Sequence, residues 1–169
     1  MENLTVRKLR EAFPDAVLEV GFFRSEVTVV LRREEIVKVC RFLRDDPDLR
    51  YDFLSDLTAV DRLGSPQRGS PTFGARFEVV YHLYSIPRKG RVRLKVRAEE
   101  GEAVPSVTSV WEGANWYERE VYDLFGIPFE GHPDLRRLIM PEEFEGHPLR
   151  KDFPVSAAPP WWEEIRDRA

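Results

Sequence analysis

Residues 91–98 read RVRLKVRA, so cations and apolar side chains alternate over eight positions. Successive side chains of a strand point to opposite faces of its sheet, so this alternation predicts a strand with one buried face and one wet face. Residues 51–60 and 73–84 have the β-branched and aromatic content of two further strands. Residues 63–72 (LGSPQRGSPT) are dense in Gly, Ser and Pro and predict a mobile loop between two antiparallel strands.

A hairpin and two helices are predicted upstream of these strands. Residues 16–23 and 26–31 are rich in β-branched and aromatic side chains and flank a short polar turn, which predicts a β-hairpin. Apolar residues recur at helical spacing over residues 3–13 and 33–44, so each stretch is expected to form an amphipathic helix. The second helix contains the only cysteine, Cys40, which we interpret as core filler rather than a reactive thiol.

A third and longer helix is predicted over residues 104–125. It opens with Pro105, and Gly126 stands at its expected C′ position. Gly113 weakens the pattern locally and is a point where the helix could split in two. The apolar stripe that predicts packing on the sheet has spacings of four and three, and consists of Val110, Ala114, Tyr117, Val121 and Leu124.

The character of the chain changes after Gly126. Seven of the 13 prolines lie between Pro128 and Pro160, and no helical or strand period persists. Disordered tails are depleted in large apolar residues, whereas this segment contains many of them. We therefore predict a folded domain over residues 1–126 and an extended, Pro-rich docking arm over residues 127–169. Large apolar residues along the arm include Phe129, Leu135, Leu138, Ile139, Met140, Phe144, Leu149, Phe153, Trp161 and Trp162.

Composition narrows the class of protein. The 169 residues are 42% hydrophobic and 33% charged, which suffices for one compact domain with an extension. A formal net charge of -4 gives no global positive field for nucleic acid or an anionic membrane surface. A single cysteine allows neither an internal disulfide nor a cysteine-ligated iron-sulfur cluster. No stretch approaches the roughly 20 apolar residues of a membrane helix, so we expect a soluble, cytosolic protein that reaches membranes only through partners.

Motifs of catalysis and cofactor binding do not occur in the sequence. Neither G-x-G-x-x-G, G-x-x-x-x-G-K-[ST] nor G-x-S-x-G is found, so no catalytic or cofactor-binding residue is predicted. The three histidines, His82, His132 and His147, include no i, i+4 pair, and the last two stand in Gly-His-Pro turns. A metal site there would need further convergent carboxylates. We interpret both as turn histidines that hydrogen-bond the backbone, and predict no metal site.

Three carboxylates, Glu118, Glu120 and Asp123, could act as general acids or bases, because Glu120 and Asp123 are spaced i, i+3 on a helix. The competing interpretation is a solvated helix face with an Arg119–Asp123 ion pair at i, i+4. On the physics of the residues alone, the second interpretation is favoured.

Four cations in the arm, Arg136, Arg137, Arg150 and Lys151, raise the possibility of phosphate or RNA contact. Residues 131–154 carry five acidic side chains as well: Asp134, Glu142, Glu143, Glu145 and Asp152. Mixed charges favour a charge-patterned protein interface over a polyanion site.

Residues 118–127 (EREVYDLFGI) form the most distinctive motif of the sequence. They match the pattern E-R-E-x-[FY]-D-[LM]-[FY]-G-[IV], and on this stretch the chain resembles the C subunit of respiratory complex I, the 30-kDa-subunit family. The similarity continues through residues 129–137 (FEGHPDLRR) and 146–154 (GHPLRKDFP). The specific similarity thus covers about residues 111–154. Upstream of residue 111, only the length and the order of the predicted elements resemble the family.

The resemblance implies a fold, partners and a function. The fold is a two-layer α+β domain with a mixed, mostly antiparallel five-stranded sheet and helices on one face. Its order is helix, two strands, helix, three strands and helix, as the periodicity independently predicts. The implied protein is a cofactor-free scaffold in the peripheral arm of a proton-pumping NADH:quinone oxidoreductase, on the cytoplasmic side of the membrane. Its implied partners are the D subunit, which holds the quinone site, with the B and I subunits nearby.

Similar subunits occur in plastoquinone-linked NAD(P)H complexes, F420H2 dehydrogenases and membrane-bound hydrogenases, and the motif does not separate these. A freestanding enzyme and an adaptor that binds a peptide along a sheet edge are the competing classes. The family signature predicts a set of structural and interface residues. These are Glu118, Arg119, Glu120, Tyr122, Asp123, Phe125, Gly126, Gly131, His132, Pro133, Arg136, Arg137, Gly146, Pro148, Leu149, Arg150, Lys151, Asp152, Phe153 and Pro154. Among them, Glu118, Arg119, Glu120 and Asp123 are expected to fix the helix against the start of the arm, through charge-assisted hydrogen bonds to backbone amides and arginines.

Overall fold

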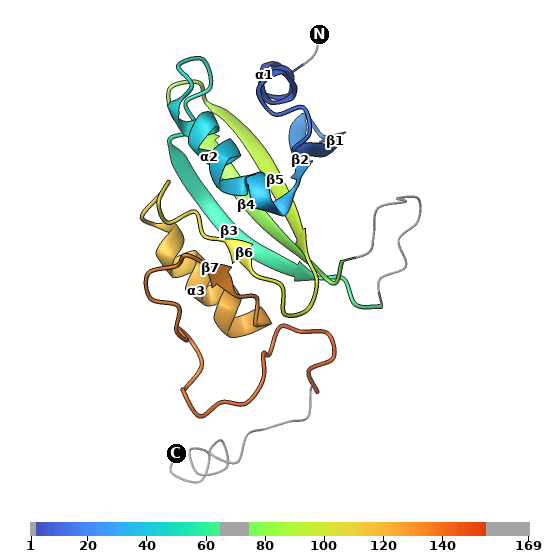
Figure 1. Ribbon diagram of the computed structural model, residues 1–169, viewed down its shortest axis with the longest axis vertical. Coiled ribbons are helices and arrows are strands. Elements are labelled where there is room, and N and C mark those ends of the chain that lie inside the picture. Colours follow the sequence, from blue (N-terminus) through green and yellow to red (C-terminus); the bar gives the residue numbers. More distant parts are fainter. Residues whose placement is uncertain (1–2, 65–74, 155–169) are drawn as a thin grey trace.

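The computed structural model describes residues 3–64 and 75–154 (Figure 1). Most of the predicted loop 63–72 lies outside these ranges, as do the first residues of the strand predicted over 73–84 and the arm beyond residue 154. The described chain has the predicted α+β fold. Helices α1 and α2 lie over one face of a mixed five-stranded sheet, and α3 lies beside β3 (Figure 1).

The sheet has the strand order β1-β2-β5-β4-β3. Strands β2 and β5 pair in parallel and every other neighbouring pair is antiparallel, so the sheet is mixed and mostly antiparallel, as predicted. The hairpin turn between β1 and β2 places Arg24 and Ser25 at φ 48° and 67°, the left-handed pair that suits the twist of a two-residue hairpin. The strands are β1 Val17–Phe23, β2 Glu26–Leu31, β3 Phe53–Asp61, β4 Phe77–Ser85 and β5 Gly90–Ala98.

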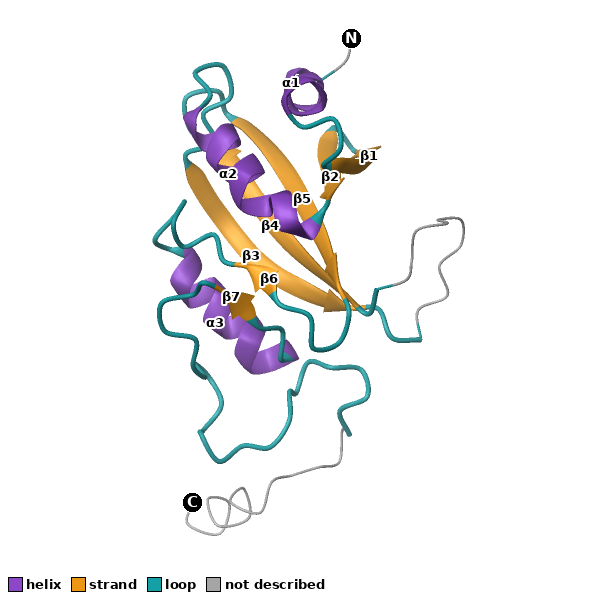
Figure 2. Cartoon of the chain, in the orientation of Figure 1, coloured by secondary structure: helices purple, strands orange, loops and turns teal. Residues whose placement is uncertain are grey.

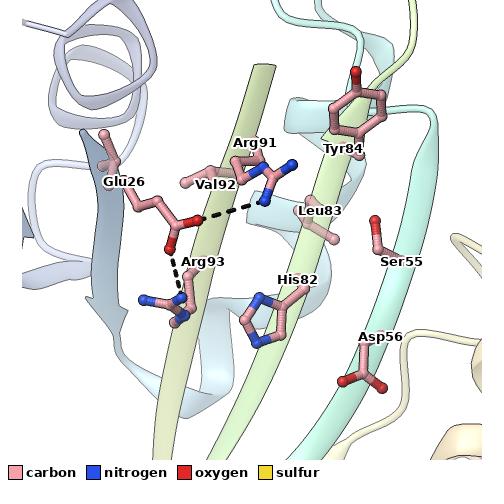
Figure 3. A pocket seen from close by; sticks show the side chains of 10 residues that line it. Glu26, Ser55, Asp56, His82, Leu83, Tyr84, Arg91, Val92 and Arg93 are labelled. Carbon is pink, nitrogen blue, oxygen red and sulfur yellow. Dashed lines mark hydrogen bonds and ion pairs between the residues drawn. The ribbon is translucent and has the colours of Figure 1, made fainter. Parts of the chain in front are cut away.

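Strand β5 has the two-faced character that its alternation predicts. Val92, Leu94 and Val96 are buried in the core. The cations of the other face pair with carboxylates of other strands. Arg93 pairs with Glu26 of β2 at 2.8 Å, Lys95 with Glu78 of β4 at 3.2 Å and Arg97 with Glu19 of β1, two strands away, at 3.2 Å. Figure 3 shows a hollow on this face, where Glu26 bridges two arginines of β5 and His82 lies toward Asp56 of β3.

Helices α1 (Leu4–Ala12) and α2 (Ile36–Asp45) confirm the first two predicted helices. The side chain of Asn3 accepts from the amide of Thr5 at 3.0 Å and so caps α1. A 3-10 turn, Arg33–Glu35, precedes α2. Cys40 is fully buried on the inner face of α2, and burial raises the pKa of its thiol far above the usual range, which confirms its role as core filler.

The predicted helix 104–125 is correct only in its second half. Helix α3 spans Ala114–Phe125, whereas Val104–Pro105 is a short strand, β6, paired in parallel with β7 (Phe129–Glu130). Pro105 has no amide to offer a helix, and the next two amides bind Glu130 O at 2.8 Å and the Glu118 carboxylate at 2.7 Å. Turns therefore replace the first half of the predicted helix. Gly126 adopts φ 72° as the left-handed C-cap, as predicted.

The described part of the arm curves around α3 instead of extending away from it (Figure 2). Between Gly126 and Pro154 its one regular element is the two-residue strand β7. Ile127 and Phe129 are buried in the same core as the sheet and helices, and Phe144 is buried as well. The boundary at residue 126 stays a prediction, since packing at this junction is continuous.

Candidate functional site

The carboxylate of Asp123 binds the arm through four hydrogen bonds. It is fully buried on α3. Its Oδ2 accepts from the consecutive amides of residues 138, 139 and 140 at 3.0, 2.7 and 2.8 Å, and its Oδ1 accepts from Arg137 at 2.7 Å. Burial by itself disfavours the charged form, but the amides and the guanidinium outweigh it and hold the pKa of Asp123 below its usual value. Asp123 is thus an ionised anchor for the arm.

Arg119, one turn before Asp123, binds the carbonyl groups of the same segment. Its guanidinium donates to Arg136 O at 3.2 Å and Arg137 O at 3.1 Å, and lies 5.2 Å from the centre of the exposed Trp116 ring. The interpretation of Arg119 and Asp123 as a solvated i, i+4 ion pair is therefore wrong. Both side chains are buried, and each binds backbone groups of the arm. Buried backbone N–H and C=O groups without a hydrogen-bond partner destabilise a fold, so these contacts stabilise the arm against α3.

The arm also caps the C-terminal end of α3. The last four carbonyl groups of a helix have no partner within it. Here all four accept hydrogen bonds, one from Gly126 and three from residues 147–150. To donate to Asp123 O, His147 must carry its proton on Nδ1. The positive charge of Arg150 interacts favourably with the negative C-terminal end of the helix dipole. The pairs are Gly126 N to Tyr122 O (2.9 Å), His147 Nδ1 to Asp123 O (2.8 Å), Leu149 N to Leu124 O (3.1 Å) and Arg150 Nε to Phe125 O (2.6 Å).

Gly126 is required twice at this cap. Its φ of 72° disfavours any side chain, and a Cβ would lie 2.4 Å from the His147 ring and 2.6 Å from the Arg150 guanidinium. We call the assembly of Arg119, Asp123, Gly126 and the last-turn carbonyls of α3 with residues 136–150 the α3 clamp.

Glu118 points away from the α3 clamp. Its carboxylate accepts from the Ser106 hydroxyl at 2.6 Å and the Val107 amide at 2.7 Å, and so holds the turns that precede α3. Glu118 is fully buried, and burial raises its pKa to about 7 despite both hydrogen bonds. Glu120 is exposed. The expected solvated face is therefore correct for Glu120 and wrong for Glu118 and Asp123.

The raised pKa of Glu118 predicts a pH-dependent stability. An acid whose folded pKa lies above its unfolded value stabilises the fold most at low pH, and the benefit is lost as pH rises from about 4.5 to about 7. A shift of this size corresponds to about 3 kcal/mol. Glu118→Gln, which imitates the protonated acid, is expected to remove this component from urea-unfolding free energies measured between pH 4.5 and 7.5. An unchanged pH profile in the variant would contradict the assignment.

Beyond the α3 clamp, an ion cluster binds residues 150–152 of the arm to the sheet. Arg76, immediately before β4, pairs with Asp61 at 3.1 Å, Asp152 at 2.6 Å and Glu100 at 2.7 Å. The amide of Lys151 donates to Asp61 at 3.0 Å, and Arg150 pairs with Glu100 at 2.7 Å. Asp61, Arg76 and Glu100 carry no motif or periodic signal, and sequence reasoning missed them. The predicted charge contacts of Arg150 and Asp152 are thus made within the chain.

The remaining signature residues shape the arm itself. His132 hydrogen-bonds Asn115 O through Nε2 at 3.2 Å and accepts from the Asp134 amide through Nδ1 at 3.0 Å, so both predicted turn histidines contact backbone. Arg137 also donates to Phe144 O at 2.8 Å and Gly146 O at 3.1 Å. The rings of Phe144 and Phe153 stack at 5.8 Å. Gly131 and Gly146 have φ of 80° and 90°.

The other signature residues differ in burial. Phe125 is buried, Tyr122 and Pro148 are half-buried, and the exposed ones are Pro133, Arg136, Leu149, Lys151 and Pro154.

Neither a metal cluster nor a membrane helix occurs in the described part of the chain. Across residues 3–64 and 75–154, no three His, Cys, Asp or Glu side chains are grouped so that they could hold a metal ion. In the same ranges, no helix has both the length and the apolar character needed to cross a bilayer.

Comparison with known proteins identifies the class to which this fold and clamp belong. Residues 29–159 match the family described as "Respiratory-chain NADH dehydrogenase, 30 Kd subunit". The chain belongs to this family, which confirms the resemblance inferred from residues 118–127.

Several relatives of the chain are named as the C subunit of NADH-quinone oxidoreductase. The relative so named from Roseiflexus sp. (strain RS-1) is 52% identical over 159 residues, covering 93% of this chain and 87% of the relative. A Geotalea uraniireducens protein of the same name is 52% identical over 154 residues, covering 90% and 88%. The Geobacter metallireducens protein of that name is 51% identical over 154 residues, covering 90% of each chain.

Proposed function

We propose that this chain is a non-catalytic structural and docking subunit of a proton-translocating NADH:quinone oxidoreductase. In that complex, electrons pass from NADH through FMN and iron-sulfur clusters to quinone. The names of the relatives support membership of the complex. The observation that carries the docking role is the α3 clamp, because the charged signature residues Arg119 and Asp123 are engaged in fixing the arm.

A freestanding enzyme that uses Glu118, Glu120 and Asp123 is the competing function. General acid–base chemistry needs groups that converge on one substrate position. In the structure Glu118 binds the turns before α3, Asp123 binds the arm and Glu120 is exposed. Their divergence supports the scaffold over the enzyme.

The proposed partners are the quinone-site D subunit, with the B and I subunits nearby, on the cytoplasmic side of the membrane. The arm would meet the D subunit in the conformation that the α3 clamp already imposes. Fixing a flexible segment costs roughly 1 to 2 kcal/mol per residue, so an arm ordered before docking loses less entropy on binding. Exposed apolar side chains on the arm, Ile139 and Leu149, are available for such a contact.

Equivalent subunits of plastoquinone-linked, F420H2-oxidising or hydrogen-evolving complexes are the second candidate. All the relatives named above are called NADH-quinone oxidoreductase subunits, which favours NADH as the electron donor.

Spectroscopy and turnover assays test the scaffold role. The purified chain is expected to be colourless and unable to oxidise NADH, because one buried cysteine and no dinucleotide motif leave it without a redox centre. The complex containing the chain should reduce quinone. A stoichiometric visible chromophore in the anaerobically purified chain, or its turnover of NADH alone, would overturn the proposal.

A further inference from the structure

His147 lies at the C-terminal end of α3, inside the α3 clamp. Its ring is half-buried, and its Nδ1 donates to Asp123 O at 2.8 Å. In the neutral ring Nδ1 therefore holds the one proton, and Nε2 carries a lone pair. Any further proton that the ring takes up must bind Nε2.

The nitrogen that would take this proton faces a cation. Nε2 of His147 and Nη2 of Arg150 lie 2.4 and 2.6 Å from the position that a Cβ of Gly126 would occupy, so the two nitrogens are close neighbours. The Arg150 guanidinium is held there, because it donates to Phe125 O at 2.6 Å and to Glu100 at 2.7 Å. A proton on Nε2 would place a second positive charge beside a guanidinium that cannot turn away without breaking these bonds.

The other charged groups that act on the ring do not offset this repulsion. Arg137 donates to Gly146 O, just before His147, at 3.1 Å and adds a second cation. The carboxylate of Asp123 is already bound to Arg137 and to three arm amides. Burial and the two arginines outweigh the hydrogen bond to Asp123 O and the charge of the same residue, and lower the pKa of His147 below its usual value.

We propose that His147 is a proton-sensitive switch that releases residues 147–150 from the end of α3 when its ring becomes cationic. The ring and Arg150 belong to one turn, closed by the Arg150 amide, which donates to His147 O at 3.1 Å. Separating the two cations therefore moves this turn and breaks the bond from the Leu149 amide to Leu124 O. The inference goes beyond the proposed docking role, and the full-length chain alone suffices to test it.

The switch should respond to mild acid and act at one end of the clamp only. A histidine whose folded pKa is lowered stabilises the fold fully above its unfolded value of 6.5, and this contribution is lost as pH falls below that value. Asp123, whose pKa is lowered, stays ionised in this range and keeps its hold on residues 138–140. Glu118 acts in the opposite direction, because its raised pKa makes acid stabilise the fold. Release of residues 147–150 in mild acid therefore reports on His147.

Hydrogen exchange and NMR of the full-length chain test the switch. The protection factor of the Leu149 amide, which corrects for the intrinsic effect of pH on exchange, should fall several-fold between about pH 7.5 and 5.5. The protection factors of residues 138–140 should not change. Over the same range the nitrogen shifts of the His147 ring should report conversion of the Nδ1–H tautomer into the cation. A neutral ring protonated on Nε2, or Leu149 protection that persists while the ring becomes cationic, would overturn the proposal.

His147→Asn separates titration from capping. The asparagine amide can donate to Asp123 O in place of Nδ1 but takes up no proton in this range, so the Leu149 protection factor should lose its pH dependence. His82→Asn, in β4 and outside the arm, is the matched control and should keep the pH dependence of the parent chain. If the dependence persisted in His147→Asn, another group would release the turn and the proposal would be wrong.

Discussion

Replacing Asp123 by Asn is expected to weaken both the native chain and its assembly into the complex. The carboxylate accepts four hydrogen bonds in a fully buried position. An amide has one oxygen and no negative charge, so it must leave either Arg137 or the three arm amides without an acceptor. Loss of a buried, hydrogen-bonded charge of this kind costs on the order of 3 kcal/mol.

Urea unfolding and recovery of assembled complex measure the two effects of Asp123→Asn. Glu120→Gln removes the same charge from an exposed position on the same helix and should leave the free energy of unfolding unchanged. Quinone reduction per assembled complex should be unaffected in both variants, since Asp123 acts through the arm. If Asp123→Asn assembled normally but selectively blocked quinone reduction, a catalytic role for Asp123 would have to be restored.

Most of the fold could be predicted because its elements carry regular periods. The alternation in residues 91–98 places Val92, Leu94 and Val96 in the core. The 3.6-residue period of residues 33–44 likewise predicts the buried face of α2. In both cases burial repeats with the geometry of the backbone, so a local pattern suffices.

The prediction of a helix over the first half of residues 104–125 was wrong, because turns bury the apolar residues whose spacing suggested a helix. Val110 is buried, as the stripe required, but it reaches the core from a turn and not from a helix. The decisive contacts are non-local: the amide of Val107 binds Glu118, and the amide of Ser106 binds Glu130. No window of sequence contains both partners and their geometry.

Two interpretations of the signature residues Arg119 and Asp123 had different outcomes. Their i, i+4 spacing alone favoured a pair with each other, which is wrong. The signature instead predicted that both fix the helix to the start of the arm, and in the structure each binds the arm backbone, about 15 to 18 residues away along the chain. The cluster of Asp61, Arg76 and Asp152 joins segments farther apart still, which only the folded topology brings together.

Removing the arm is expected to have the largest effect on partner binding. The helices α1 and α2 and all five strands of the main sheet precede residue 126, so deletion of residues 128–169 should leave a domain with a cooperative unfolding transition. Its free energy of unfolding should fall, because deletion removes the buried Phe129 and Phe144 and exposes the apolar surface that they cover. The loss is roughly 25 cal/mol per Å² of apolar area exposed. Binding to the D subunit should be lost with the docking surface.

The affinity of the full and the truncated chain for the D subunit tests the docking role most directly. The two affinities can be compared once the truncated chain has been found to unfold cooperatively in urea. We expect tight binding by the full chain and about a hundredfold weaker binding by the truncated domain, a loss of roughly 3 kcal/mol of binding free energy. Equal affinity of the two chains would show that residues 128–169 are not the docking element.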